Sequence, residues 1–232
     1  MNLAPTTDQL DLRESIRDVL SAQCPPSFVR QAMSDDQAWR GLWSTAVELG
    51  WTSLATRLVD DSGLGTFDLV LTLEACGEAL APLPMVSSVG LAAGALQAGG
   101  EAMANELQLI ADGQVATLIA QPAAHRLPAA PMALRDGRVH VSVGEITDAT
   151  RADTFVVLCA TTDPARSYVA TVPIGPGVTV TPTPSVDPSR PMARLEIDAE
   201  PRAVESVDTS EALAPAMAAL AAELVGVAAA AA

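Results

Sequence analysis

Two glutamates and two histidines are the first residues of this 232-residue chain to consider for acid–base chemistry. Glu74 and Glu78 are one helical turn apart, and two carboxylates held close together can act as an acid and a base. In a helical pattern such a pair is more typical of a solvated face, which is the interpretation we favour. His140 alternates with Val139 and Val141. The strand period of two therefore predicts that it points to solvent rather than to a metal.

The second histidine lies in the segment TLIAQPAAHRLP, residues 117–128. A short apolar run ends there at Gln121, and a loop carrying His125 and Arg126 follows. An ordinary solvated loop would explain these residues. A ligand loop would use Arg126, because a guanidinium pairs well with phosphate or carboxylate groups. The residues alone leave both interpretations open.

The charge and the cysteines exclude several classes of function. The net charge is −15, and so acidic a surface repels nucleic-acid phosphates and anionic membranes, so we expect neither as a partner. Cys24, Cys76 and Cys159 are odd in number and form no Cys-x-x-Cys pair. This pattern predicts reduced, partly buried thiols and no metal site. All thirteen basic residues are arginine, which excludes lysine-based chemistry.

The distribution of apolar residues predicts a cytoplasmic protein. We expect no apolar stretch that reaches the roughly 20 residues needed to span a bilayer. Charged residues also occupy the N-terminal region where a signal peptide has its apolar segment.

Residues 1–112 have a helical period and are predicted to form an N-terminal helical domain. Leu12, Ile16 and Leu20 form one stripe of a first helix, and Thr6 with Gln9 resembles a capping box before it. Pro25 and Pro26 are expected to end that helix. Further helices are expected at about 36–49, 67–81, 85–97 and 101–111. The three tryptophans are at helical positions and are predicted to be core.

Residues 113–207 change to a period of two and are predicted to form an antiparallel β-barrel or sandwich. Short β-type runs are separated by Gly, Pro and Asp turns, as in that class of fold. The runs lie at 115–120, 138–143, 153–161, 167–172, 178–182 and 192–198.

Residues 208–232 form a third region. Asp208 to Glu211 has a capping pattern, and Ala-dominated sequence follows it. We expect the first helix of an incomplete C-terminal helical domain, either in a truncated chain or docked on something outside it, because a lone apolar helix has nothing to pack against. The predicted fold class is α+β multidomain, with a helical domain, a β-barrel domain and the start of a helical domain.

Several local runs, in this order, resemble the acyl-CoA dehydrogenase family. They are LTLEACGEALAPLP (71–84), SSVGLAAGAL (87–96), IADGQVATLIAQP (110–122), ITDATRADTFVVL (146–158) and the run 176–198. The resemblance implies an FAD cofactor between the barrel and the C-terminal helices, and an acyl-CoA substrate. It also implies electron transfer to an electron-transferring flavoprotein. The family's catalytic carboxylate lies in the C-terminal domain, so no catalytic residue is assigned within residues 1–232.

The family's flavin-binding motifs can be carried over residue by residue. The loop Thr-Glu-Pro-Gly-x-Gly-Ser-Asp falls on residues 120–127. Its threonine is replaced by Ala120 and its serine by Arg126, while Gln121 is a neutral isostere of the glutamate. In the second motif, Thr147 keeps the flavin-contacting threonine and Asp148 replaces asparagine. These five residues are the cofactor-binding positions that the resemblance implies.

Much of the flavin site is therefore replaced. Glu145 stands where the family has a tryptophan against the flavin, and a carboxylate there disfavours an anionic reduced flavin. This pattern resembles the degenerate subunit of bacterial α2β2 dehydrogenases, which share one FAD per heterodimer with a subunit carrying the intact loop. Members of that group often act on bulky acyl-CoAs such as steroid side-chain thioesters.

Three functions are compatible with these residues. The chain is a subunit that contributes to a shared flavin and acyl-CoA site, or a non-catalytic structural or regulatory paralogue that binds the partner subunit without its own flavin. The third is a homo-oligomeric dehydrogenase with a diverged loop. The flavin content of the protein alone and with a partner separates them.

Overall fold

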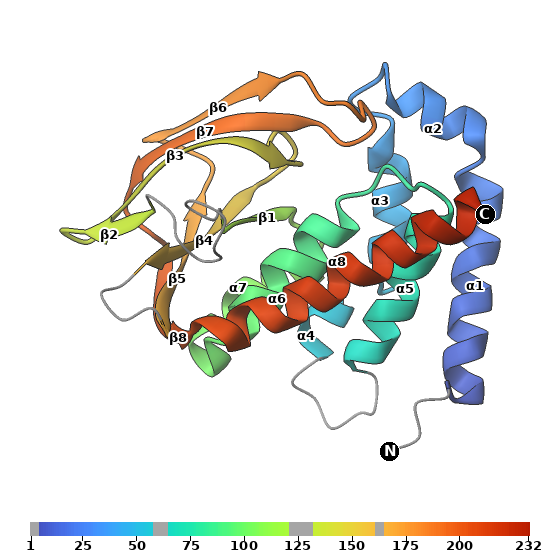
Figure 1. Ribbon diagram of the computed structural model, residues 1–232, viewed down its shortest axis with the longest axis horizontal. Coiled ribbons are helices and arrows are strands. Elements are labelled where there is room, and N and C mark those ends of the chain that lie inside the picture. Colours follow the sequence, from blue (N-terminus) through green and yellow to red (C-terminus); the bar gives the residue numbers. More distant parts are fainter. Residues whose placement is uncertain (1–4, 58–64, 121–131, 161–164) are drawn as a thin grey trace.

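The computed structural model describes residues 5–57, 65–120, 132–160 and 165–232 (Figure 1). Helices come first, two sheets follow, and a long C-terminal helix, α8, returns across the first helices (Figure 1). This order confirms the predicted sequence of helical, β-rich and helical regions. The N-terminal helices are α1 (Thr7–Gln23), α2 (Pro26–Ala32), α3 (Trp39–Glu48), α4 (Leu54–Arg57), α5 (Thr66–Glu78), α6 (Ala93–Gln97) and α7 (Ala104–Ala111), with the short η1 (Met85–Ala92) and η2 (Gly100–Met103) between them.

The beginning of α1 confirms the predicted capping box. The Gln9 amide donates to Thr6 Oγ1 at 3.3 Å, and the Thr6 amide donates to Gln9 Oε1 at 3.0 Å. Pro25 and Pro26 end α1, as expected, but Pro26 also begins α2, which was not predicted. Proline suits a first helical position because the amide it lacks would have no partner there.

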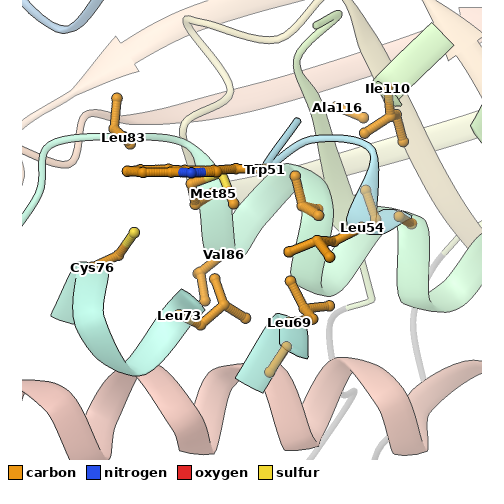
Figure 2. Close-up of a cluster of buried hydrophobic side chains, with 14 of the residues drawn as sticks. Trp51, Leu54, Leu69, Leu73, Cys76, Leu83, Met85, Val86, Ile110 and Ala116 are labelled. Atoms are coloured by element: carbon orange, nitrogen blue, oxygen red, sulfur yellow. The ribbon is translucent and has the colours of Figure 1, made fainter. Parts of the chain in front are cut away.

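The helices enclose an apolar core in which Trp39, Trp43 and Trp51 are all buried, as predicted. Figure 2 shows part of this core, where Trp51 lies with Leu83 and Met85. The predicted helix over 85–97 is present, but its first part, η1, is a π-helix that continues into α6. A π-helical turn is wider than an α-helix and often marks a functional or strained position.

The β-rich region contains two four-stranded sheets. The strands are β1 (Ala116–Ile119), β2 (Ala133–Arg135), β3 (Arg138–Thr147), β4 (Thr154–Ala160), β5 (Arg166–Pro173), β6 (Val178–Thr183), β7 (Met192–Ala199) and β8 (Ala203–Asp208). One sheet has the order β1-β4-β5-β8 and the other β2-β3-β7-β6. The β1–β4 pair is parallel and the other pairs are antiparallel.

The two sheets pack face to face, and the described strands do not close into a barrel. Phe155 and Val157 of one sheet share a core with Leu195 and Ile197 of the other. The opposite face of the first sheet packs on the helices through residues such as Val156. β4 is therefore covered on both faces, which explains its continuous apolar sequence.

The C-terminal helix α8 (Thr209–Ala231) corrects two expectations. It is long and apolar enough to cross a membrane by length and composition, so the expectation that no such stretch exists was wrong. The expectation that this segment has nothing to pack against was also wrong, because it lies along α5, η1 and α6 (Figure 1). Its capping residue is confirmed: Asp208 Oδ1 accepts from the amides of Ser210 and Glu211 at 2.8 and 3.1 Å.

Small residues set the close approach of α8 to its neighbours. A Cβ on Gly226 would collide with the Glu74 carbonyl of α5, and a Cβ on Gly77 would collide with the Glu223 carbonyl of α8. A Cβ on Gly90 of η1 would lie 2.7 Å from that of Ala219. These contacts place the α8 backbone directly on the helical core, as occurs where small residues line a helix interface.

Candidate functional site

The candidate site is built at the end of β3, where the chain twice adopts the left-handed conformation. The pairing of β3 with β7 shifts register between Val143 and Ile146, and Glu145 within this bulge has a φ of 63°. Thr147 is the last paired residue of β3, opposite Met192. Asp148 follows with a φ of 57°. Bulges redirect side chains, and here the turn buries Asp148 while Glu145 stays exposed.

Asp148 is 2% exposed, and the rest of the protein satisfies its polar groups. Ser87 Oγ of η1 donates to Asp148 Oδ2 at 2.6 Å, and Arg151 Nη1 donates to Asp148 Oδ1 at 3.0 Å. The Asp148 amide donates to the Pro191 carbonyl at 2.7 Å. The Asp148 carboxylate therefore links the end of β3 to η1. The main chain of Asp148 links the end of β3 to the loop between β6 and β7.

Arg151 forms the other half of this network. Its Nη1 also donates to the Pro82 carbonyl, and its Nη2 donates to the Ser189 carbonyl, each at 3.1 Å. Its guanidinium carbon lies 5.1 Å from the centre of the Trp39 ring, a cation–π distance. Burial lowers the pKa of Arg151 below its usual value, and the adjacent Asp148 opposes that shift. The pair is thus a buried structural ion pair between the helices and the sheets.

Thr147 is held through its main chain and leaves its side chain available. Thr117 Oγ1 of β1 donates to the Thr147 carbonyl at 2.9 Å, so β1 and the end of β3 are adjacent. Thr147 is half-buried, and its hydroxyl makes no hydrogen bond with the described residues. Ala120 follows β1 three residues after Thr117, roughly 10 Å further along an extended chain. Gln121 and Arg126 lie outside the described residues.

A second buried ion pair lies beside the first and was not anticipated from the sequence. Arg190 Nη1 and Nη2 donate to the two carboxylate oxygens of Glu223 at 2.9 and 2.5 Å. Asp187 adds a longer contact, with its Oδ2 3.8 Å from Arg190 Nε. Burial opposes the charge of Arg190, but Glu223 raises its pKa above the usual value. One signal for this pair was present in the sequence: Glu223 lies on the apolar side of an Ala-rich helix. A charged residue buried there requires a partner of opposite charge.

The acid–base candidates of the sequence do not form a site. Glu78 is exposed and pairs with Arg17 at 2.6 Å, while Glu74 is half-buried on the same helix. The His140 side chain is 42% exposed and its Nδ1 lies 3.7 Å from Asp198 Oδ1, so it points away from the core as predicted. No group of three His, Cys, Asp or Glu residues suited to a metal ion occurs in the part of the chain that the structure describes.

The three cysteines are free and buried. Burial raises the pKa of the Cys24 thiol to about 11 and those of Cys76 and Cys159 to about 12. All three are therefore protonated at neutral pH, and a protonated thiol is a poor nucleophile.

Comparison with known proteins shows which family the helical region resembles. Residues 6–113 match the acyl-CoA dehydrogenase N-terminal domain. A stretch of 98 residues is 33% identical to the acyl-CoA dehydrogenase FadE27 of Mycobacterium tuberculosis, covering 41% of this chain and 26% of that protein. Residues 6–113 therefore form a domain of the acyl-CoA dehydrogenase N-terminal type. Members of this family are oxidoreductases.

Solved structures show that the similarity in fold extends beyond residues 6–113 of this chain. The ChsE4-ChsE5 complex from Mycobacterium tuberculosis gives a TM-score of 0.79 at 23% identity, over 97% of this chain and 65% of that one. The Tcur3481-Tcur3483 steroid ACAD variant gives 0.79 at 21%, over 97% and 64%. Butyryl-CoA dehydrogenase from Megasphaera elsdenii gives 0.76 at 17%, over 100% and 68%. The chain thus spans about two thirds of these relatives.

The described residues fit only a small part of a flavin site. The free Thr147 hydroxyl can hydrogen-bond a flavin ring. Ala120 has no polar side-chain atom, and both carboxylate oxygens of Asp148 are already engaged. The exposed Glu145 adds negative charge near the same end of β3. These residues by themselves do not form a complete site for FAD.

Proposed function

We propose that this chain is a subunit of an FAD-dependent acyl-CoA dehydrogenase and shares its flavin with a second, dehydrogenase-like subunit that carries the intact flavin loop. The observation that carries the proposal is the free hydroxyl of Thr147, at a position where Ala120 offers only a methyl group and the Asp148 carboxylate is already occupied. A half-site of this kind needs complementary groups from another chain.

The fold neighbours support a paired assembly. The ChsE4-ChsE5 structure is a complex of two proteins, and Tcur3481-Tcur3483 is a steroid ACAD. In the proposed α2β2 assembly the reaction is the α,β-desaturation of an acyl-CoA, such as a steroid-type thioester. The bound FAD would supply the oxidising chemistry, and an electron-transferring flavoprotein would accept the electrons.

The flavin content of the purified protein tests the proposal. The chain would be expressed alone and together with a dehydrogenase-like protein that retains the Thr-Glu-Pro-Gly-x-Gly-Ser-Asp loop. We expect a colourless protein alone and a yellow complex with one flavin per pair. Stoichiometric flavin in the chain alone would instead support a homo-oligomeric dehydrogenase. A stable complex without flavin would support the non-catalytic paralogue.

A matched pair of threonine variants makes the test specific to this site. Thr147→Val removes the free hydroxyl with little change of shape, and we expect the complex to lose flavin more readily on dialysis. Thr179→Val makes the same change on an exposed position of β6 and should retain flavin like the parent. Equal retention by both variants would remove Thr147 from the cofactor site.

A further inference from the structure

An apolar cavity of about 580 Å³ lies between α1, α2 and the C-terminal end of α5. Its volume is within the range of roughly 300–1,000 Å³ that is typical of small-molecule sites. Most of its wall is aliphatic or sulfur-containing, including Leu20, Cys24, Val29, Met33 and Leu80. None of its lining residues belongs to the group around Thr147, and the proposed function does not use the cavity.

The mouth of the cavity exposes two large apolar side chains. Met33 is 45% exposed and Leu80 is 48% exposed. Leu80 follows the end of α5 with a φ of 50°, a conformation that glycine usually occupies after a helix. Its amide donates to the Gly77 carbonyl at 3.0 Å, which fixes the turn. The chain thus holds an apolar side chain in an unfavourable conformation at the rim, as is common at binding sites.

The charged residues on the rim leave one cation free. Arg17 is neutralised by Glu78, with Arg17 Nη2 2.6 Å from Glu78 Oε2. Arg30 also lines the cavity and is exposed, and it has no hydrogen bond or ion pair with any described residue. In a chain of net charge −15, an unpaired guanidinium beside an apolar cavity provides local complementarity to an anion.

We propose that this cavity binds a small amphipathic carboxylate. The hydrocarbon part of the ligand lies against Leu20, Val29 and Met33, and the carboxylate pairs with Arg30. The apolar wall supplies affinity in proportion to the area it buries, and Arg30 selects anions over cations of the same shape. This assignment stands independently of flavin binding or of a partner subunit.

Isothermal titration calorimetry of the 232-residue chain with dodecanoate, kept below its micellar concentration, tests the site. We expect saturable binding of one molecule per chain and much weaker binding of dodecyltrimethylammonium. Arg30→Gln should weaken dodecanoate binding about two- to fivefold, the effect of an exposed ion pair. Arg135→Gln removes another exposed arginine, on β2, and should leave the affinity unchanged.

A second variant separates the cavity from general surface binding. Ser21→Trp places a bulky side chain at an exposed position that lines the cavity, and should abolish saturable binding while circular dichroism stays unchanged. Equal affinity for the carboxylate and the ammonium probe would overturn the proposal. So would unsaturable binding, or full binding by a folded Ser21→Trp chain.

Discussion

Ser87 and Asp148 are 61 residues apart in the chain, yet the Ser87 hydroxyl donates a hydrogen bond of 2.6 Å to the buried Asp148 carboxylate. The same carboxylate accepts from Arg151, which also donates to the main chain of Pro82 and Ser189. The position that the family resemblance assigned to the cofactor is therefore also a structural junction. It joins the π-helical turn, the end of β3 and the loop before β7.

Asp148→Asn is expected to destabilise the protein, although asparagine is the residue that the family resemblance places there. The change leaves the Arg151 charge buried without its counter-ion, and the Arg151 side chain is only 5% exposed. Removing one partner of a buried ion pair costs about 3–5 kcal/mol of unfolding free energy. Urea denaturation followed by circular dichroism measures the change.

Asp198→Asn is the matched control, because Asp198 pairs with Arg138 on an exposed surface. Its effect should be much smaller, because solvent screens an exposed ion pair. If the two variants lose equal stability, the Asp148–Arg151 pair has no special structural role.

The sequence predicted those parts of the fold that depend on neighbouring residues. The capping box of Thr6 and Gln9 is local, and it is present in the structure. β7 alternates between buried and exposed positions, so its strand period was visible. The parallel pairing of β1 with β4 was not visible, because it depends on residues almost 40 positions apart, such as Ala116 and Thr154.

The candidate site was less predictable than the fold, because it depends on contacts between residues that are far apart in the sequence. The family resemblance placed Asp148 at a cofactor-binding position, but its inward direction depends on a positive φ and on Ser87 from another element. The packing of α8 likewise depends on Gly77 and Gly226 meeting main-chain atoms across the interface. Neither arrangement leaves a periodic signal in the sequence.

Gly226→Ala is expected to destabilise the packing of α8. A methyl group there would collide with the Glu74 carbonyl, which is main chain and cannot rotate away. Overpacking of this kind costs about 1–3 kcal/mol or more. Thermal unfolding should show a lower midpoint, and hydrogen exchange should show faster exchange of α8 amides.

Gly41→Ala in α3 is the matched control for that variant. Apart from its chain neighbours and the backbone of its own helix, no described atom lies within 4 Å of the position where its Cβ would be built. Since alanine is the better helix former, this change should stabilise the protein by about 0.5–1 kcal/mol. A Gly226→Ala protein as stable as the parent would show that α8 can shift without loss.

Alkaline pH is expected to reduce stability through the buried thiols. Burial raises the pKa of Cys76 from 9.0 to about 12 in the folded protein. The contribution of the Cys76 thiol to the free energy of unfolding is therefore fully present below pH 9, where the folded and unfolded states both hold the proton. It is lost as the pH rises toward 12. The slope for one such thiol is up to about 1.4 kcal/mol per pH unit. Urea unfolding between pH 8 and about 11 should show this decline, and Cys76→Ala should make it shallower. An unchanged slope in that variant would assign the decline to other groups.

Removing either Arg190 or Glu223 alone is expected to destabilise the protein, because the remaining charge would be buried without its partner. Glu223→Gln leaves Arg190 with only the longer contact to Asp187, at 3.8 Å. Since Arg190 is 20% exposed, the loss should be near the lower end of the range for buried pairs, about 3 kcal/mol. The double variant Arg190→Met with Glu223→Leu removes both charges and replaces them with apolar volume, so it should recover most of that loss. Urea denaturation of this double variant and of the single variants Arg190→Met and Glu223→Leu completes a double-mutant cycle that measures the coupling. Additive losses in the cycle would mean that the two residues act independently, and that α8 is held to the loop before β7 by packing alone.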